Sequence, residues 1–154
     1  MKSLVIYETY FGNTEKIAQA VAKTLGAELI EAADARAEQL GGVELLVAAS
    51  PTRAFRPSEI ITKFLKNLPD GALKGIKVAA FDTRMDVQKV NNKFLTFMAK
   101  HMGYADVVLA KMLVKKGGQF VEPTAGFFVE ESEGPLADGE LERAVEWAKS
   151  LSTQ

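Results

Sequence analysis

The sequence predicts an α/β domain in which helices cover both faces of a parallel sheet. Two observations lead to this prediction: short continuous apolar runs of strand length, and amphipathic segments of helix length that alternate with them. Strands of a parallel sheet that are buried on both faces show such continuous apolar runs. The length of 154 residues fits one domain, which we expect to span residues 1–154.

The first half of the chain supplies three expected strands and two expected helices. The strands are expected at residues 2–7, 28–31 and 43–49. A helix that ends at Gly26 has an apolar face formed by Ile17, Ala20, Val21 and Leu25. A second helix has an apolar stripe formed by Ile60, Ile61, Phe64, Leu65 and Leu68. This half therefore reads strand, helix, strand, strand, helix.

The second half begins with a strand at residues 76–81 and then departs from simple alternation. Two helical segments, 88–102 and 105–116, follow in succession, although the apolar residues 107–109 could equally begin a strand. Two pieces of a last strand, 119–122 and 126–130, are separated by Pro123-Thr124. The chain then forms a final helix whose inner face is expected to contain Leu141, Ala144, Val145, Ala148 and Leu151, with Trp147 in the core.

The helix expected at 88–102 has an unusual apolar stripe, formed by Val90, Phe94, Phe97, Met98 and Met102. Such a stripe is either ordinary core, or a lid over a ligand, or a contact of a homodimer. At the end of this helix we expect His101 to face the terminal carbonyl groups.

Composition excludes several classes of protein. The chain has no Cys and a single His, so disulfides, thiolate nucleophiles and thiol or polyhistidine metal sites are excluded. The formal net charge of −1 provides no field for nucleic acid or an anionic membrane. No apolar run approaches the roughly 18 residues of a spanning helix, and the N-terminus lacks a secretory pattern. We therefore expect a cytoplasmic protein whose redox chemistry, if any, needs an organic cofactor.

Ligands of open parallel sheets bind beyond the carboxyl ends of the strands, which directs attention to loops 8–14, 50–57 and 82–87. Residues 9–14 join a strand to a helix N-terminus, where backbone N–H groups and hydroxyls can hold a phosphate without Lys or Arg. The alternative is a turn in which Asn13 or Thr14 only caps the helix. The loop contains neither the dinucleotide fingerprint nor the P-loop fingerprint.

Residues 5–14, Val-Ile-Tyr-Glu-Thr-Tyr-Phe-Gly-Asn-Thr, followed by Ala18 and Val21, resemble the flavodoxin signature, an aromatic-ended strand followed by T-x-x-G-x-T and a helix. The resemblance extends to a subfamily with Phe-Asp-Thr-Arg at a strand end, here residues 81–84. It includes C-terminal stretches at residues 128–129, 133–136 and 139–144, and so covers nearly the whole chain.

This resemblance implies a flavodoxin-like, doubly wound sheet of five parallel strands in the order 2-1-3-4-5, here with an extra helix after strand 4. It implies FMN at the point where the strand order reverses. The phosphate is then assigned to Thr9, Tyr10, Phe11, Gly12, Asn13 and Thr14. The isoalloxazine ring is assigned to the loops that contain Ser50, Pro51, Thr52, Arg53, Ala54, Phe55, Asp82, Thr83 and Arg84. No catalytic residue is expected, because the flavin carries the chemistry.

Two features set the chain apart from typical electron-carrier flavodoxins, which are strongly acidic and usually stack a Trp or Tyr on the flavin. This chain is nearly neutral, and its second and third loops offer only Phe55 as an aromatic residue. Arg53 and Arg84 are expected near the flavin's pyrimidine side, where a cation would stabilise the anionic reduced state, whereas Arg56 is expected to be an ordinary surface residue.

The resulting hypothesis is an FMN-binding electron carrier or oxidoreductase that serves a redox partner protein or a small-molecule electron acceptor. The alternative is a binding or regulatory module of the same fold without flavin. A phosphate-accepting receiver domain is discarded, because it needs an acidic pair after the first strand and an Asp after the third, where this chain has Glu8 and Ser50.

Overall fold

A computed structural model describes residues 1–53, 55–86 and 93–154. Its strands are β1 (Ser3–Tyr7), β2 (Glu28–Glu31), β3 (Leu45–Pro51), β4 (Lys77–Met85), β5 (Gln119–Phe120) and β6 (Ala125–Val129). Its helices are α1 (Asn13–Leu25), α2 (Glu59–Asn67), α4 (Lys93–Met102), α5 (Ala105–Lys115) and α6 (Glu140–Ser152), with 3-10 turns at Ala32–Asp34 and Ala37–Leu40.

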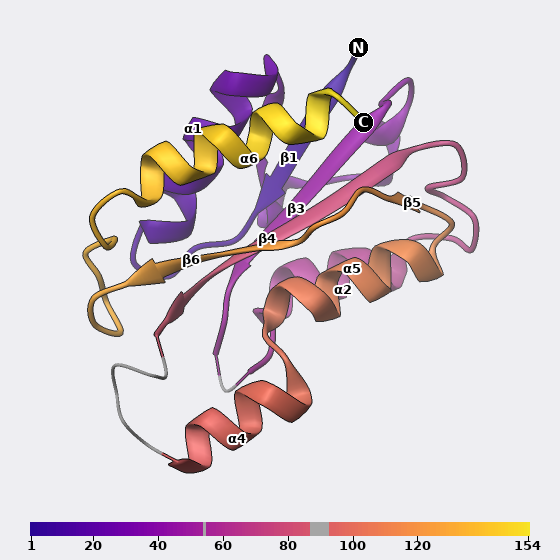
Figure 1. The fold of residues 1–154 in the computed structure, drawn as a ribbon. Helices are drawn as coiled ribbons and strands as arrows, with labels where there is room; N and C mark the ends of the chain where they lie inside the picture. Colours follow the sequence, from indigo (N-terminus) through magenta and orange to yellow (C-terminus); the bar gives the residue numbers. More distant parts are fainter. Residues whose placement is uncertain (54, 87–92) are drawn as a thin grey trace.

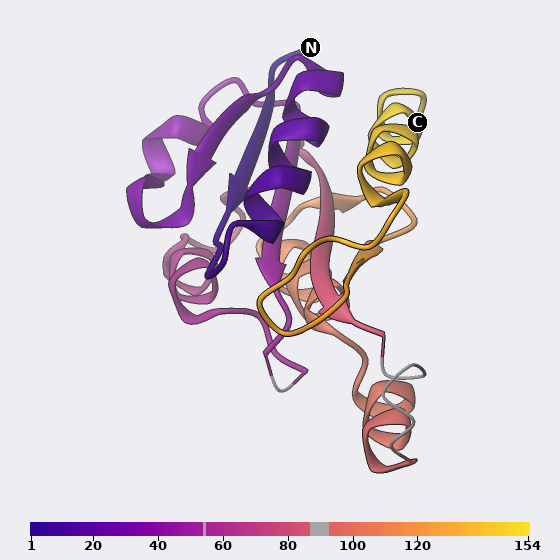
Figure 2. The same cartoon turned by 90° about the vertical axis from the view of Figure 1, so that its left-hand side faces the viewer.

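The sheet is parallel throughout and has the strand order β2-β1-β3-β4-β5, which confirms the predicted fold class. β5 pairs with the start of β4, at Lys77 and Val78, and β6 pairs with its end, from Phe81 to Met85. The last strand is therefore in two pieces, as predicted. The extra helix after the fourth strand is α4, and both views show it set away from the sheet and the helices that cover it (Figures 1 and 2).

Helices α1 and α6 cover one face of the sheet, and α2 and α5 cover the other (Figure 1). Successive residues of each central strand point into different cores: in β1, Leu4 and Ile6 join the core beneath α2 and α5, whereas Val5 and Tyr7 join the core beneath α1 and α6. Both alternating sets are apolar because both faces are buried. This explains the continuous apolar runs in the sequence.

Trp147 belongs to the core beneath α6, as predicted. Its ring packs edge-to-face on Phe81 with a centroid distance of 5.6 Å, and its indole N–H donates to the carbonyl oxygen of Pro123 at 2.9 Å. By contrast, the predictions that Ile60 and Leu141 lie on the inner faces of their helices are wrong, because both side chains are exposed.

Two boundaries also differ from expectation. Residues 105–115 are helical, so the alternative strand at 107–109 is wrong. Residues 82–85, expected to be loop, continue β4, because Gly126 to Val129 of β6 supply a partner ladder. The side chains of Val90, His101 and Met102 lie outside the described residues. Within the part of the chain that the structure describes, no helix has the length and apolar character to cross a membrane.

Candidate functional site

A cavity of about 450 Å³ lies at the carboxyl edge of the sheet. Three predicted loops line it, with residues Thr9, Tyr10, Phe11, Asn13, Thr14, Pro51, Thr52, Arg53, Thr83 and Arg84. Its volume falls within the roughly 300–1,000 Å³ of typical ligand pockets. The structure thus brings most of the predicted site residues around one cavity, and their role toward a cofactor stays a prediction.

The remaining predicted residues lie elsewhere. Gly12 shapes the first loop without lining the cavity, and Phe55 lines a neighbouring cavity. Ser50 is fully buried, and its hydroxyl accepts a hydrogen bond at 2.8 Å from the backbone N–H of Ser58, so it ties β3 to the start of α2. Asp82 is also fully buried, and Ala54 lies outside the described residues.

The first loop turns sharply at Gly12, whose φ of 90° lies in the left-handed region that favours glycine. The Gly12 N–H donates to the Thr9 hydroxyl oxygen at 2.9 Å, which closes the turn. No side chain caps the N-terminus of α1, so the alternative in which Asn13 or Thr14 caps this helix is wrong. Among the described residues, no side chain accepts a hydrogen bond from the first-turn N–H groups of α1, which lie at the cavity.

The two side chains that follow Gly12 make other hydrogen bonds. The Asn13 amide donates to the carbonyl oxygen of Glu133 at 3.0 Å, which fastens the loop after β6 to the start of α1. The Thr14 hydroxyl lies 2.7 Å from the Thr83 hydroxyl, so the start of α1 and the end of β4 meet at a buried hydroxyl pair. One of these hydroxyls donates to the other, and the second keeps a proton for another acceptor.

Arg84 is held by two carboxylates. Its guanidinium donates to both carboxylate oxygens of Asp82, at 2.7 and 2.8 Å, and lies 3.1 Å from Asp106 Oδ2. The ring of Tyr104 packs against it, with 3.8 Å from the guanidinium carbon to the ring centroid. A Cβ atom at position 126 would collide with this guanidinium, so Gly126 on β6 makes room for it.

This cluster places two carboxylates beside Arg84, which the sequence predicts as a cation near the flavin's pyrimidine side. Its positive charge is compensated by Asp82 and Asp106, and its side chain is only 14% exposed. Burial raises the pKa of Asp82 to about 7, although the Arg84 ion pair acts in the opposite direction. Arg53 differs, because it is exposed and stacks on Tyr10 at 4.7 Å from the ring centroid.

Sequence reasoning missed a fourth loop that closes the cavity, formed by residues after β6. Val129, Ser132 and Glu133 line the cavity together with Met85. The rule that ligands bind beyond carboxyl ends applies to β6 as well, so this loop could have been included. No sequence signal marked Tyr104 and Asp106, because α5 brings them to Arg84 only in the folded chain.

Comparisons with solved structures support the fold. The structure resembles a flavodoxin from the domain Archaea with a TM-score of 0.76 and 17% identity, over 99% of this chain and 97% of that one. It resembles oxidised flavodoxin 2 of Bacillus cereus with a TM-score of 0.75 and 20% identity, over 99% of each chain.

A similar domain also occurs within a longer protein. The chain matches 35% of the rubredoxin oxygen:oxidoreductase of Desulfovibrio gigas, with a TM-score of 0.72, 17% identity and 99% of this chain covered. No curated protein sequence matches this chain. A family model described as a flavodoxin domain matches residues 4–117, which is well over half of the sequence. The chain therefore belongs to the flavodoxin domain family, and FMN is the cofactor that this membership implies.

Proposed function

We propose that this protein is an FMN-dependent electron carrier or oxidoreductase that binds FMN in the 450 Å³ cavity. The observation that carries the proposal is the uncapped start of α1 at one end of this cavity. Backbone N–H groups and the positive end of the helix dipole favour a phosphate at such a position. The hydroxyls of Thr9, Thr14 and Thr83 add polar contacts without a Lys or Arg.

The remaining lining fits a flat ring system. Pro51, Thr52 and Arg53 form one wall, and Arg84 and Met85 belong to another part of the lining. Tyr10 and Phe11, which are 45% and 50% exposed, provide aromatic surface from the first loop, where the second and third loops offer little. When bound, FMN supplies the redox chemistry, and these residues bind it, orient it and exclude water.

Replacing Thr14 with Val tests the phosphate site. The substitution roughly conserves shape but removes a hydroxyl of the Thr14–Thr83 pair. FMN affinity is expected to fall by about 1.5–3 kcal/mol, or roughly tenfold to a hundredfold, if the pair serves the charged phosphate. Fluorescence quenching during FMN titration measures this change.

Thr24→Val is the matched control, because Thr24 lies on the same helix, does not line the cavity, and donates its hydroxyl to the carbonyl oxygen of Ala20. This variant should bind FMN with unchanged affinity. Unchanged affinity in folded Thr14→Val would exclude the loop from the cofactor site. If the wild-type protein binds no FMN at all, the alternative of a flavodoxin-fold module without flavin is correct.

We also infer a homodimer contact on α4. Phe94 and Phe97 are 66% and 57% exposed, and the helix stands away from the main layers (Figure 2). Exposed apolar stripes of this kind mark interaction surfaces. The double variant Phe94→Ser/Phe97→Ser should convert a dimer into a monomer in sedimentation-velocity experiments, with little change in thermal stability. A wild-type monomer at high concentration would contradict the dimer, and a large loss of stability would indicate core packing instead.

A further inference from the structure

A second cavity, of about 760 Å³, adjoins the first and has no role in the proposed function so far. It lies between the segment after β3 and helices α2 and α5. Tyr10 and Arg53 line both cavities, so this stacked pair separates the proposed flavin site from the second space. A ligand in the second cavity would therefore contact the same pair that bounds the first.

The charges around the second cavity are unequal. Arg53, Arg56 and Lys66 line it, against the single carboxylate of Glu59. The other charged residues of α2 and α5 do not line it: Lys63, Lys111 and Lys115 are exposed, and the carboxylate of Asp106 is paired with Arg84. The lining therefore favours an anion.

Apolar side chains complete the lining. Phe55, Val108 and Met112 contribute an aromatic ring, a branched side chain and a flexible thioether. Met surfaces of this type adapt to flat apolar ligands. Anionic charge and a flat apolar body are thus the two properties that this cavity can recognise together.

The wall that carries two of these cations is a tight, strained turn. Arg53 and Arg56 exchange backbone hydrogen bonds of 2.9 Å in both directions. Between them, Phe55 has a φ of 62°, a left-handed conformation that is uncommon for a bulky residue. Its ring packs against Tyr104 with a centroid distance of 5.7 Å. Strained residues of this kind persist where the surroundings hold them, and they concentrate at functional sites.

We propose that the second cavity binds a small organic anion with a flat aromatic body, next to the FMN. Only the presence of FMN in the neighbouring cavity rests on the proposed function. The proposal adds the class of small molecule that binds beside this cofactor. The cations Arg56 and Lys66 attract the acidic group, and Phe55, Val108 and Met112 contact the rings.

Isothermal titration calorimetry of the full chain, with and without saturating FMN, tests the proposal with 2-naphthoate as the probe. 2-Naphthamide, a neutral analogue of the same shape, isolates the role of charge. The double variant Arg56→Gln/Lys66→Gln should weaken naphthoate binding roughly tenfold or more and leave naphthamide binding unchanged. Lys63→Gln/Lys111→Gln removes the same charge from the surroundings but not from the lining, and should have little effect.

Val108→Trp, which places a bulky ring inside the cavity, should weaken binding of both probes in a protein with a normal circular dichroism spectrum. The proposal would be overturned if both double variants lost the same amount of naphthoate affinity. It would also be overturned if the wild type bound naphthoate and naphthamide equally well. Competition between FMN and naphthoate would also overturn it, by showing one shared site. Naphthoate binding to a chain that binds no FMN would refute the proposed function and leave this site standing.

Discussion

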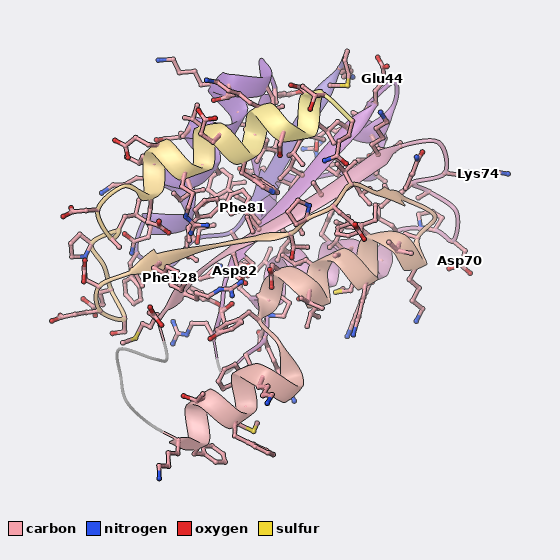
Figure 3. The ribbon with its side chains drawn as sticks, in the orientation of Figure 1. Glu44, Asp70, Lys74, Phe81, Asp82 and Phe128 are labelled. Carbon is pink, nitrogen blue, oxygen red and sulfur yellow. The ribbon has the colours of Figure 1, made fainter. Side chains whose placement is uncertain are left out.

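Arg84→Met is expected to lower the free energy of unfolding at pH 8 by about 3–5 kcal/mol. The guanidinium lies between Asp82 and Asp106, and Asp82 is fully buried on β4, facing α5 (Figure 3). Removing the cation leaves the Asp82 carboxylate without its main partner in a place that water does not reach. The loss of the Tyr104 contact adds to the cost. Chemical denaturation, followed by circular dichroism, measures the change.

Lys149→Met is the control for loss of an ion pair at the surface. Lys149 and Glu146 are 62% and 73% exposed and 3.4 Å apart, so this change should cost less than about 1 kcal/mol. In the double variant Asp82→Asn/Arg84→Met, the carboxylate and the cation leave together. Its destabilisation should be smaller than the sum of the single effects by about 1–3 kcal/mol. Additive effects would show that the pair does not act as a unit.

Most of the fold could be predicted from the sequence because its cause is local. Residues such as Val5 and Ile6 point into opposite cores, and a strand that is buried on both faces must be apolar throughout. The break at Pro123 likewise marks the point where the last strand divides between β5 and β6. Such patterns involve only a few neighbouring residues, so they can be interpreted without knowledge of tertiary contacts.

The electrostatics of the candidate site could not be predicted in the same way. Arg84 and Asp82 are two positions apart on β4, so their pairing could have been predicted from the sequence. Asp106 reaches them only because α5 packs across the strand end. Gly126 is required because the Arg84 side chain crosses β6 at that position. Both facts depend on residues that are distant in sequence. The sequence therefore predicts a cation at position 84 but not the carboxylate of Asp106 that helps to compensate its charge.

The same cluster predicts that folding stability depends on pH through Asp82. Its pKa is raised from 3.8 to about 7 in the folded protein, so the folded state favours the protonated form. The raised pKa of Asp82 therefore contributes to the free energy of unfolding. This contribution is fully present below about pH 4 and is lost as the pH rises through 7. Relative to Asp82→Asn, the wild type should lose on the order of 4 kcal/mol between pH 4 and pH 7. Urea unfolding at half-unit pH intervals gives the two curves.

Asp82→Asn serves as the reference because its amide is neutral at every pH and its oxygen can still accept from the backbone N–H of Asp106, as Asp82 does at 2.9 Å. Carboxylates remote from this cluster contribute equally in both proteins, so the difference curve reports Asp82 together with its coupling to Arg84 and Asp106. A wild type that gains stability over the variant as the pH rises would mean that the Arg84 ion pair outweighs burial. A falling curve means that Asp82 loses its proton near neutral pH, and that the charge beside Arg84 at the cavity wall then becomes more negative.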